Sequence, residues 1–330
     1  MTTPLGSLRR LVLAPSLREV TAARRGFPVD PGAAAVAHLE AVPQAVVCGF
    51  EWGIEARDQW EVQRRVELVA APQRGFVYEG VVMACTVRDA MRGGRGHRAR
   101  DLVLGPAQPH IFLTYIGIGF ALARLPRALW RAAVPDLTGS AYHPTMDWLI
   151  VDGYGFDRAY FDTRRWVQRQ YVPPAYPWRG ARDYFPRAVD QGIGRALWFI
   201  HGGAAPAAAA AVDRFASHRR ADLWSGLGLA AAFAGGCDAA GLAALRRLAG
   251  QYRPYLAQGA VFAAKARHFS GCVPDYSQAA VAALTDLTVP AAAALADDAT
   301  TSEVDGGAVP AYELWRARIR AGLAREPADR

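Results

Sequence analysis

Five polar side chains stand immediately before the first glycine of a recurring pattern, and they are the residues best suited to chemistry. They are Glu79, Asp152, Gln191, Ser225 and Gln258, and Asp190 lies beside one of them. The two carboxylates, Glu79 and Asp152, are candidate catalytic residues, because a positioned carboxyl group can give or take a proton. The amides and the hydroxyl can form hydrogen bonds with a substrate. The spacing therefore predicts a polar track along one surface of the protein.

Aromatic residues flank these positions and predict an apolar side to the same groove: Tyr78, Tyr115, Tyr154, Phe156 and Trp198. We expect them to bind substrate together with Asp190, Gln191, Ser225, Gln258 and the single lysine, Lys265, which is also a candidate nucleophile. An alternative stays open for the polar residues, because each could instead satisfy the amides at a helix start or face solvent.

The elements that carry these residues are marked by glycines at a regular spacing. The glycines stand at positions 49, 80, 117, 153, 192, 226 and 259, and the six intervals average 35 residues. This is the length of a helical hairpin with its turns. Six of the seven glycines have glycine or alanine four residues later, on the same face of a helix.

A glycine inside a helix costs about 0.5 to 1 kcal/mol relative to alanine, so its repeated use needs a reason. A flat face of small residues lets a neighbouring helix approach closely and gain dispersion contacts. The chain shows no convincing run of alternating strand residues. We therefore predict an all-α fold of tetratricopeptide-like α/α hairpins, arranged as an open superhelix or a closed toroid.

The proline and glycine clusters predict the domain boundaries. Residues 1–30 read as an irregular arm, residues 31–299 as one repeat domain, and residues 300–330 as a polar loop with a capping helix. A proline-rich excursion over residues 171–186 interrupts the repeats. Near the start we expect one helix over residues 33–40 and a separate one over residues 49–69.

The composition limits the classes of function. A net charge of +8 is scattered along the chain, so we expect no nucleic-acid binding. The densest positive cluster is Arg92, Arg95, Arg98 and Arg100; solvation explains it, and contact with an anion or a phosphopantetheine is the alternative. Four widely spaced cysteines indicate buried thiols in a cytoplasmic protein. No segment reads as a signal peptide or as a membrane span.

Motifs for common cofactors and metals are missing or lack their context. The segment GLGLAA at residues 226–231 fits a loose dinucleotide fingerprint, but no strand precedes it. The seven histidines never share a helix face at metal spacing, although ligands from distant repeats could still assemble a site. We expect neither a cofactor nor a metal.

Five segments carry a resemblance to a bacterial family: RGFVYEG (74–80), DWLIVDGYGF (147–156), DQGIGRALWF (190–199), RRADLWSGLGLA (219–230) and QGAVFAAKAR (258–267). Together they resemble the UnbL-like family of enediyne-cluster proteins, the bacterial domain of unknown function 1702. The resemblance covers about residues 26–270. It implies a role beside an iterative polyketide synthase, in the assembly of an enediyne core from a linear polyene, and it transfers no catalytic residues.

Two functions follow from this resemblance and from the predicted groove. The first is an accessory enzyme or polyene-binding factor, because burial of a hydrocarbon supplies affinity at about 25 cal/mol per Å² without any charge. The second is a non-catalytic repeat scaffold that docks the synthase, other proteins of the enediyne cassette or membrane partners. Neither the sequence pattern nor the resemblance decides whether the protein is an enzyme.

Overall fold

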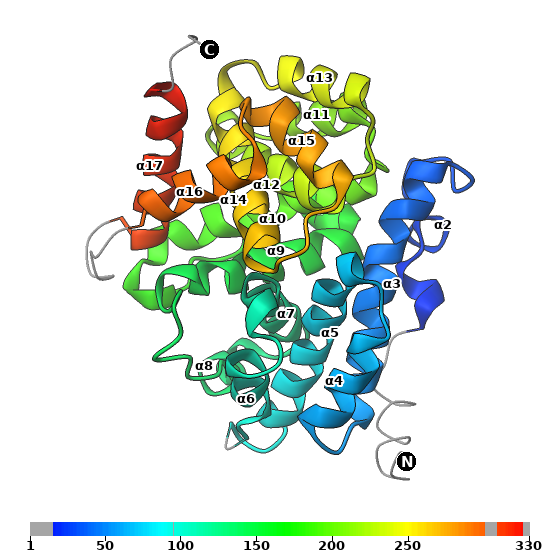
Figure 1. The fold of residues 1–330 in the computed structure, drawn as a ribbon, viewed down its shortest axis with the longest axis vertical. Helices are drawn as coiled ribbons and strands as arrows, with labels where there is room; N and C mark the ends of the chain where they lie inside the picture. The colour runs from blue at the N-terminus through cyan, green and yellow to red at the C-terminus, as the bar shows by residue number, and fades with distance from the viewer. Residues whose placement is uncertain (1–15, 95, 301–308, 326–330) are drawn as a thin grey trace. The chain divides into compact units, whose positions relative to one another are not determined.

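The computed structural model describes residues 16–94, 96–300 and 309–325, and over these ranges the protein is helical and contains no strand (Figure 1). The predicted all-α class is therefore confirmed. The chain forms two compact units. Unit 1 comprises residues 1–26 and 40–154, and unit 2 comprises residues 27–39 and 155–330. Residues 1–15 of the predicted arm and 301–308 of the predicted polar loop lie outside the described ranges.

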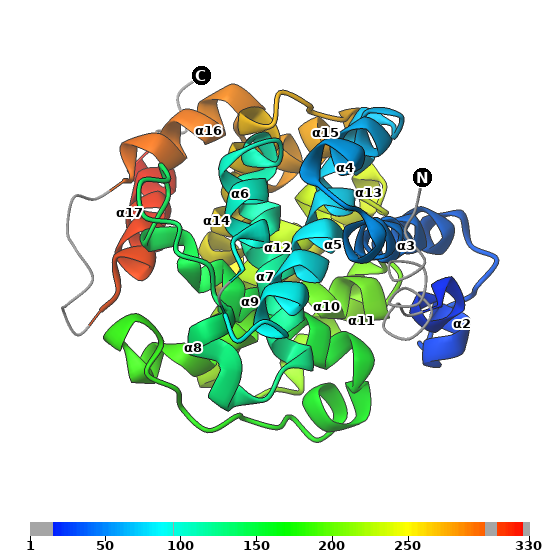
Figure 2. The same cartoon turned by 90° about the horizontal axis from the view of Figure 1, so that it is seen from below.

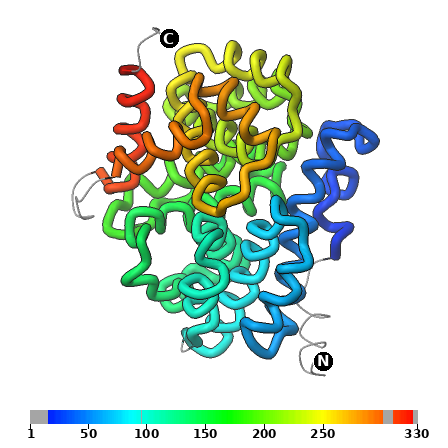
Figure 3. The backbone as a smooth tube through the Cα atoms, in the orientation of Figure 1, coloured from blue at the N-terminus to red at the C-terminus, as the bar shows by residue number. Residues whose placement is uncertain are grey.

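The helices of unit 1 begin with the short α2 (Ala22–Arg25). The next ones are α3 (Ala34–Glu55), shared with unit 2, then α4 (Gln59–Glu67), α5 (Ala71–Ala90), α6 (Arg98–Leu104), α7 (Ile111–Arg124), α8 (Trp130–Ala133) and α9 (Trp148–Phe161), also shared. The tube in Figure 3 shows the long helices α3 and α5 joined through α4. The prediction of separate helices over 33–40 and 49–69 is wrong, because the single helix α3 continues through Pro43 and Gly49.

Glycines hold the long helices of unit 1 close together. A Cβ atom at Gly80 of α5 would overlap the carbonyl oxygen of Val46 on α3, and one at Gly49 of α3 would overlap the carbonyl of Val77 on α5. Gly117 of α7 faces the carbonyl of Glu79 in the same way. Only a residue without a Cβ fits at these contacts, so the glycines set the helix spacing.

The helices that belong wholly to unit 2 follow a short π-helical segment, Arg164–Gln168. They are α10 (Phe185–Ile200), α11 (Ala205–Asp213), α12 (Ser217–Ala234), α13 (Ala239–Leu248), α14 (Arg253–Phe269), α15 (Asp275–Thr285), α16 (Val289–Asp298) and α17 (Ala311–Arg325). Figure 2 shows α12 between α10 and α14, which are its two main neighbours. Helix α17 packs mainly on α14.

The same close contact recurs in unit 2. Gly226 of α12 faces the carbonyl of Gln191 on α10, and Gly259 of α14 faces the carbonyl of Ser225 on α12. Like Gly117 with Glu79 in unit 1, each of these glycines meets the residue that precedes a glycine on the neighbouring helix. This register brings side chains at equivalent positions onto neighbouring turns of adjacent helices.

Candidate functional site

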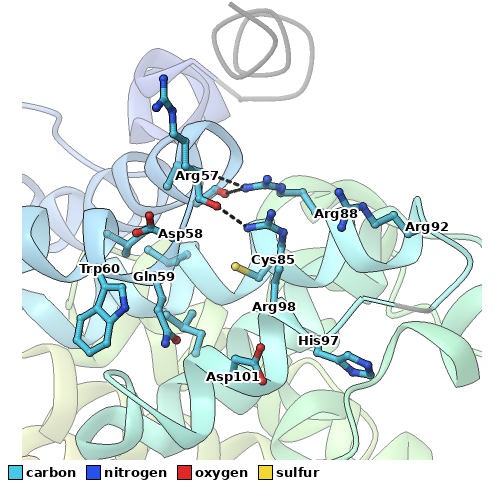
Figure 4. A pocket seen from close by; sticks show the side chains of 15 residues that line it. Arg57, Asp58, Gln59, Trp60, Cys85, Arg88, Arg92, His97, Arg98 and Asp101 are labelled. Carbon is cyan, nitrogen blue, oxygen red and sulfur yellow. Dashed lines mark hydrogen bonds between the residues drawn. The ribbon is translucent and has the colours of Figure 1, made fainter. Parts of the chain in front are cut away.

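A cavity of about 390 Å³ opens in unit 1 between the end of α3, α4, α5 and α6 (Figure 4). Its floor is apolar and buried, and includes Ala56, Val62, Val81 and Leu102. Its rim carries four arginines, two aspartates, His97 and the exposed Trp60. The cavity therefore pairs a hydrophobic interior with a charged mouth.

One stripe of α5 supplies a wall of this cavity. Val81, Cys85 and Arg88 follow one another at spacings of four and three residues, and Arg92 continues the stripe four residues later. Such spacings place side chains on a single helix face. The side chains change from apolar at Val81 to cationic at Arg88 and Arg92. The wall is therefore apolar at the floor of the cavity and positively charged at its rim.

The end of α3 orients two of the arginines. The Nη1 atom of Arg88 donates to the carbonyl oxygens of Gly53 at 2.8 Å and Ala56 at 2.9 Å, and that of Arg98 donates to the carbonyl of Arg57 at 3.1 Å. Carbonyl groups at a helix C-terminus attract cations. Figure 4 shows these bonds, with Trp60 and Arg92 at opposite sides of the cavity. A bond to a carbonyl fixes a guanidinium without cancelling its charge.

The turn into α4 has its own cap. Asp58 is the N-cap of α4 and accepts a hydrogen bond from the Glu61 amide at 2.9 Å, while Glu61 accepts one from the Arg57 amide at 3.2 Å. The pattern resembles a capping box, except that Glu61 binds the amide of the residue before the N-cap. It directs the chain away from α3 and places Arg57 and Trp60 at the mouth.

Asp89 organises the basic loop between α5 and α6. Its buried carboxylate accepts a hydrogen bond from the Ala99 amide in the first turn of α6, at 3.0 Å. Its backbone carbonyl accepts from the amides of Arg92 and Gly94. A Cβ at Gly96 would overlap the Asp89 carboxylate. Burial raises the pKa of this carboxyl, and the Ala99 hydrogen bond opposes that effect.

The electrostatics of the cavity favour an anion. Among the lining residues, four arginines against two aspartates leave a formal charge of +2 with His97 neutral, and the nearby carboxylate of Asp89, which interacts with Arg98 and Arg88, offsets part of it. Burial raises the pKa of the Cys85 thiol to about 12, so this thiol stays protonated at neutral pH and is a weak nucleophile. The cavity is thus suited to binding through charge and apolar contact.

The positive cluster predicted from the sequence divides between two roles. Arg92 and Arg98 line the cavity. Arg100 instead donates to the carbonyl of Asp136 at 3.1 Å, and Arg95 lies outside the described residues. Sequence reasoning missed Arg88, which lies on α5, and Arg57, which lies in the turn between α3 and α4.

Unit 2 contains a second polar region, a cluster of buried charges beneath α17. Arg316 is fully buried and donates from Nη1 to Asp222 at 2.8 Å, to Glu313 at 2.8 Å and to the hydroxyl of Tyr184 at 2.7 Å. Arg187 binds Asp222, and Arg320 binds Glu313. We call these six residues, together with Gln258, the α17 cluster.

Electrostatic attraction controls the ionisation of Glu313. Burial acts to raise the pKa of this carboxyl, but the charges of Arg316, Arg187 and Arg320 lower it to about 2. Glu313 therefore stays charged at neutral pH. The α17 cluster joins α17 to α12 through the buried pair of Arg316 and Asp222, to α10 through the partly exposed Arg187, and to α14 through the amide of Gln258.

A neighbouring buried pair joins Asp190 of α10 to Arg219 of α12. Arg219 contacts both carboxylate oxygens, from Nε at 3.0 and 3.2 Å and from Nη2 at 2.5 Å. Burial raises the pKa of Asp190 to about 6, although the hydrogen bonds and charge of Arg219 oppose this. The pair binds two helices together.

All twelve residues predicted for the site are buried, and none lines the cavity of unit 1. Tyr78, Glu79, Tyr115, Asp152 and Tyr154 belong to unit 1; Phe156, Asp190, Gln191, Trp198, Ser225, Gln258 and Lys265 belong to unit 2. The five polar residues that precede glycines lie inside helices, so helix-start capping does not explain them. Their assignment to a site stays a prediction.

In unit 2 the structure brings some of these residues together. The Ser225 hydroxyl donates to Gln258 at 3.3 Å, and the Gln191 amide donates to the hydroxyl of Tyr312 on α17 at 2.9 Å. Trp198 donates to the carbonyl of Gly235 at 2.8 Å, and Lys265 pairs with Asp297 at 2.5 Å. These last two contacts lie outside the α17 cluster.

In unit 1 the predicted residues form separate packing contacts. The Tyr78 ring stacks on His110 with centroids 5.5 Å apart, and Tyr154 meets Trp130 edge-on at 5.0 Å. The side chains of Glu79, Tyr115 and Asp152 are at most 3% exposed.

Within the described ranges, no group of three or more His, Cys, Asp and Glu residues is placed to hold a metal ion. No single helix there has the length and apolar character to cross a bilayer by itself; α15 and α16 meet that test only as a pair bent by 63°.

A model for the family described as a protein of unknown function, DUF1702, matches residues 4–323, and the chain belongs to that family. Membership of this family, predicted from the five segments, is confirmed. The UnbL-like relation to enediyne clusters stays a prediction. No curated protein and no solved structure matches the chain.

Proposed function

We propose that this protein is an accessory factor of enediyne polyketide biosynthesis that binds an anionic derivative of the synthase-made linear polyene in the cavity of unit 1. The resemblance to the UnbL-like family supplies the pathway. The cavity supplies the chemical class of the ligand, because its floor is apolar and its rim carries four arginines.

The observation that carries the proposal is the setting of Arg88 and Arg98. Both guanidiniums are oriented by backbone carbonyls at the mouth of the cavity. Arginine presents several N–H groups in a planar fork that matches a carboxylate or a phosphate. A ligand with such a head and an unsaturated chain would place the head at the rim and the chain on the apolar floor.

The dimensions agree with this class of ligand. A volume of about 390 Å³ lies at the lower end of the roughly 300–1,000 Å³ typical of small-molecule pockets. The exposed indole of Trp60 at the mouth can stack on a conjugated chain. A purely hydrocarbon polyene would make no use of the guanidinium groups at the rim, so we propose a carboxylate or a phosphopantetheine-linked form.

We also propose that the glycine-paired helices are units of a tetratricopeptide-like repeat. The support is the shared register, in which Gly117 meets the carbonyl of Glu79, and Gly226 that of Gln191. In this proposal the protein acts in the cytoplasm beside the polyketide synthase or other enediyne-cassette proteins. Glu79 and Asp152 remain the acid–base candidates for any chemical step.

Deletion of the gene in a producing host, followed by metabolite analysis, tests the role in the pathway. The proposal expects loss of the enediyne and accumulation of a polyene carboxylate or a carrier-bound polyene. Complementation with Arg88→Gln and Arg98→Gln together should restore less product than complementation with Arg100→Gln, which changes an arginine outside the cavity. Unchanged enediyne production in the deletion strain would contradict the proposal.

A further inference from the structure

The hydrogen bonds of Arg316 are unevenly shared between its two terminal nitrogens. Nη1 carries two hydrogens but faces three acceptors, on Asp222, Glu313 and Tyr184. Nη2 also carries two hydrogens, is buried, and has no partner. The side chain is 0% exposed, so bulk water does not satisfy this nitrogen. A buried donor left without an acceptor is costly.

Gln258, beside it on α14, has the same imbalance. Its Oε1 accepts from Arg316 Nε at 3.2 Å, Ser225 Oγ at 3.3 Å and Arg320 Nη1 at 3.4 Å, while its buried Nε2 has no partner. Exchanging the amide oxygen and nitrogen would turn the NH2 toward two guanidinium donors. The arginines therefore fix the amide with its oxygen toward them, and the NH2 group is left as a buried donor without an acceptor.

The α17 cluster has no spare carboxylate oxygen for these two donors. Both oxygens of Asp222 accept from Arg187 or Arg316, and both oxygens of Glu313 accept from Arg316, Arg320 or Tyr184. Three arginines also meet only two carboxylates, which leaves one excess positive charge. The cluster lacks both an acceptor and a negative charge.

A water molecule would not correct this imbalance. It accepts hydrogen bonds, but its own two hydrogens then need acceptors in a cluster where the carboxylates are already occupied. An oxyanion only accepts hydrogen bonds and brings the missing charge.

We propose that unit 2 contains a binding site for a small oxyanion, a carboxylate or a phosphate, held by Arg316 Nη2 and Gln258 Nε2. This site is separate from the cavity of unit 1 and independent of the function proposed for it. A bound oxyanion neutralises the α17 cluster and strengthens the docking of α17 on α14.

Thermal unfolding of the full-length protein tests the site. Sodium chloride is replaced by sodium acetate or by inorganic phosphate at constant pH and ionic strength. The wild type should show a saturable rise in Tm with acetate, with phosphate or with both. A response to acetate alone assigns the site to carboxylates, and a response to phosphate alone assigns it to phosphate-type ligands.

Gln258→Glu is the informative variant, because it replaces the unsatisfied donor by an acceptor and adds the missing charge. The Tm of this variant should not rise saturably with acetate or phosphate. It should change only by the general salt effect that all variants share. Gln278→Glu makes the same change on an exposed position of α15 and should respond as the wild type does. An equal rise in wild type and Gln258→Glu would overturn the proposal.

A crystal structure of the wild type grown with the effective anion gives a second readout that needs no variant. The proposal expects an oxyanion within hydrogen-bond distance of Arg316 Nη2 and Gln258 Nε2. A single water molecule there, or no density between the two donors, would overturn it.

Discussion

Two groups of arginines, one in each unit, have opposite kinds of partner. At the cavity of unit 1, Arg88 and Arg98 donate to backbone carbonyls and sit at an opening. In the α17 cluster of unit 2, Arg316 is fully buried and bonds directly to the carboxylates of Asp222 and Glu313. The first arrangement places guanidinium groups at the opening of a cavity, whereas the second pairs them with carboxylates that join helices.

The difference shows why a count of basic residues is a poor guide to function. The partners decide the role: a neutral carbonyl orients a guanidinium and leaves its charge in place, whereas a carboxylate cancels it. The exposure of the side chain then determines how much stability its removal costs, because removal of one partner from a buried ion pair leaves an uncompensated charge. The following predictions test this contrast, beginning with the largest effect.

Arg316→Met should cause the largest loss of stability. It leaves Asp222 and Glu313 buried without their shared cation, which costs about 3 to 5 kcal/mol in comparable buried pairs. Chemical denaturation measures the loss. Arg318→Met on the same helix is the control, because Arg318 is exposed and donates to the carbonyl of Thr300. Equal losses in the two variants would remove the contrast between buried and exposed arginines.

Acidification should weaken unit 2 through Glu313. Its pKa of about 2 in the folded protein lies below the usual glutamate value of 4.5, because the charges of Arg316, Arg187 and Arg320 outweigh the effect of burial. Its stabilisation is therefore complete above pH 4.5 and is lost as the pH falls toward 2. The shift corresponds to about 3 kcal/mol.

Denaturation of wild type and Glu313→Gln at a series of pH values measures this contribution. The difference between the two proteins should shrink as the pH falls through this window. Asp190, whose pKa burial raises to about 6, is present in both proteins and cancels in the comparison. A constant difference from pH 4.5 down to pH 2 would show that Glu313 is not held ionised by its arginines.

Glycine contacts are the feature in which the units should agree. Alanine at Gly80 would press on α3, with the Phe50 nitrogen 2.7 Å away, and alanine at Gly226 would press on α10, with the Arg195 nitrogen 2.7 Å away. We expect each substitution to lower stability by about 1 to 3 kcal/mol, despite the better helix propensity of alanine.

Gly322→Ala on α17 is the matched control, because its new methyl group meets only the end of the Leu295 side chain. This flexible contact can move aside, so we expect a smaller loss or a gain in Tm. If Gly80→Ala and Gly226→Ala were as stable as Gly322→Ala, the close approach of the helices would not set the packing of either unit.

Arg98→Gln should have the smallest effect on stability. Its hydrogen bond to the Arg57 carbonyl is near the surface, and its loss should cost about 0.5 to 1 kcal/mol. Chemical denaturation of Arg98→Gln and Arg316→Met under the same conditions compares the stability lost at the cavity with that lost in the α17 cluster. A loss as large as that of Arg316→Met would mean that Arg98 is structural.

The sequence predicted the all-helical class and the close helix contacts, because glycine spacing is a local signal. Gly49, Gly80, Gly226 and Gly259 all face a backbone carbonyl of a neighbouring helix. It did not predict helix boundaries equally well. Pro43 cannot donate a backbone hydrogen bond, yet α3 continues through it to Glu55. One lost bond does not end the helix here, because Leu39, Val42 and Val47 on either side of Pro43 are buried.

The cavity and the α17 cluster escaped the sequence analysis for a different reason. The stripe of Val81, Cys85 and Arg88 is visible on α5, but nothing local shows that the end of α3 and the start of α6 lie beside it. On α17, Glu313, Arg316 and Arg320 share a face, which reads as a solvated surface. The neighbouring Tyr312 and Trp315, both buried, were the signal that this helix is covered.

The central claim is that the cavity arginines hold their charge for an anionic, unsaturated ligand, and fluorescence titration with parinaric acid tests it most directly. This conjugated polyene carboxylate should bind the wild type, and its methyl ester should bind at least about tenfold more weakly, since a charged hydrogen bond contributes about 1.5 to 3 kcal/mol. The Arg88→Gln and Arg98→Gln double variant should lose this preference, and Arg100→Gln should keep it. Equal affinities for acid and ester in the wild type would contradict the account.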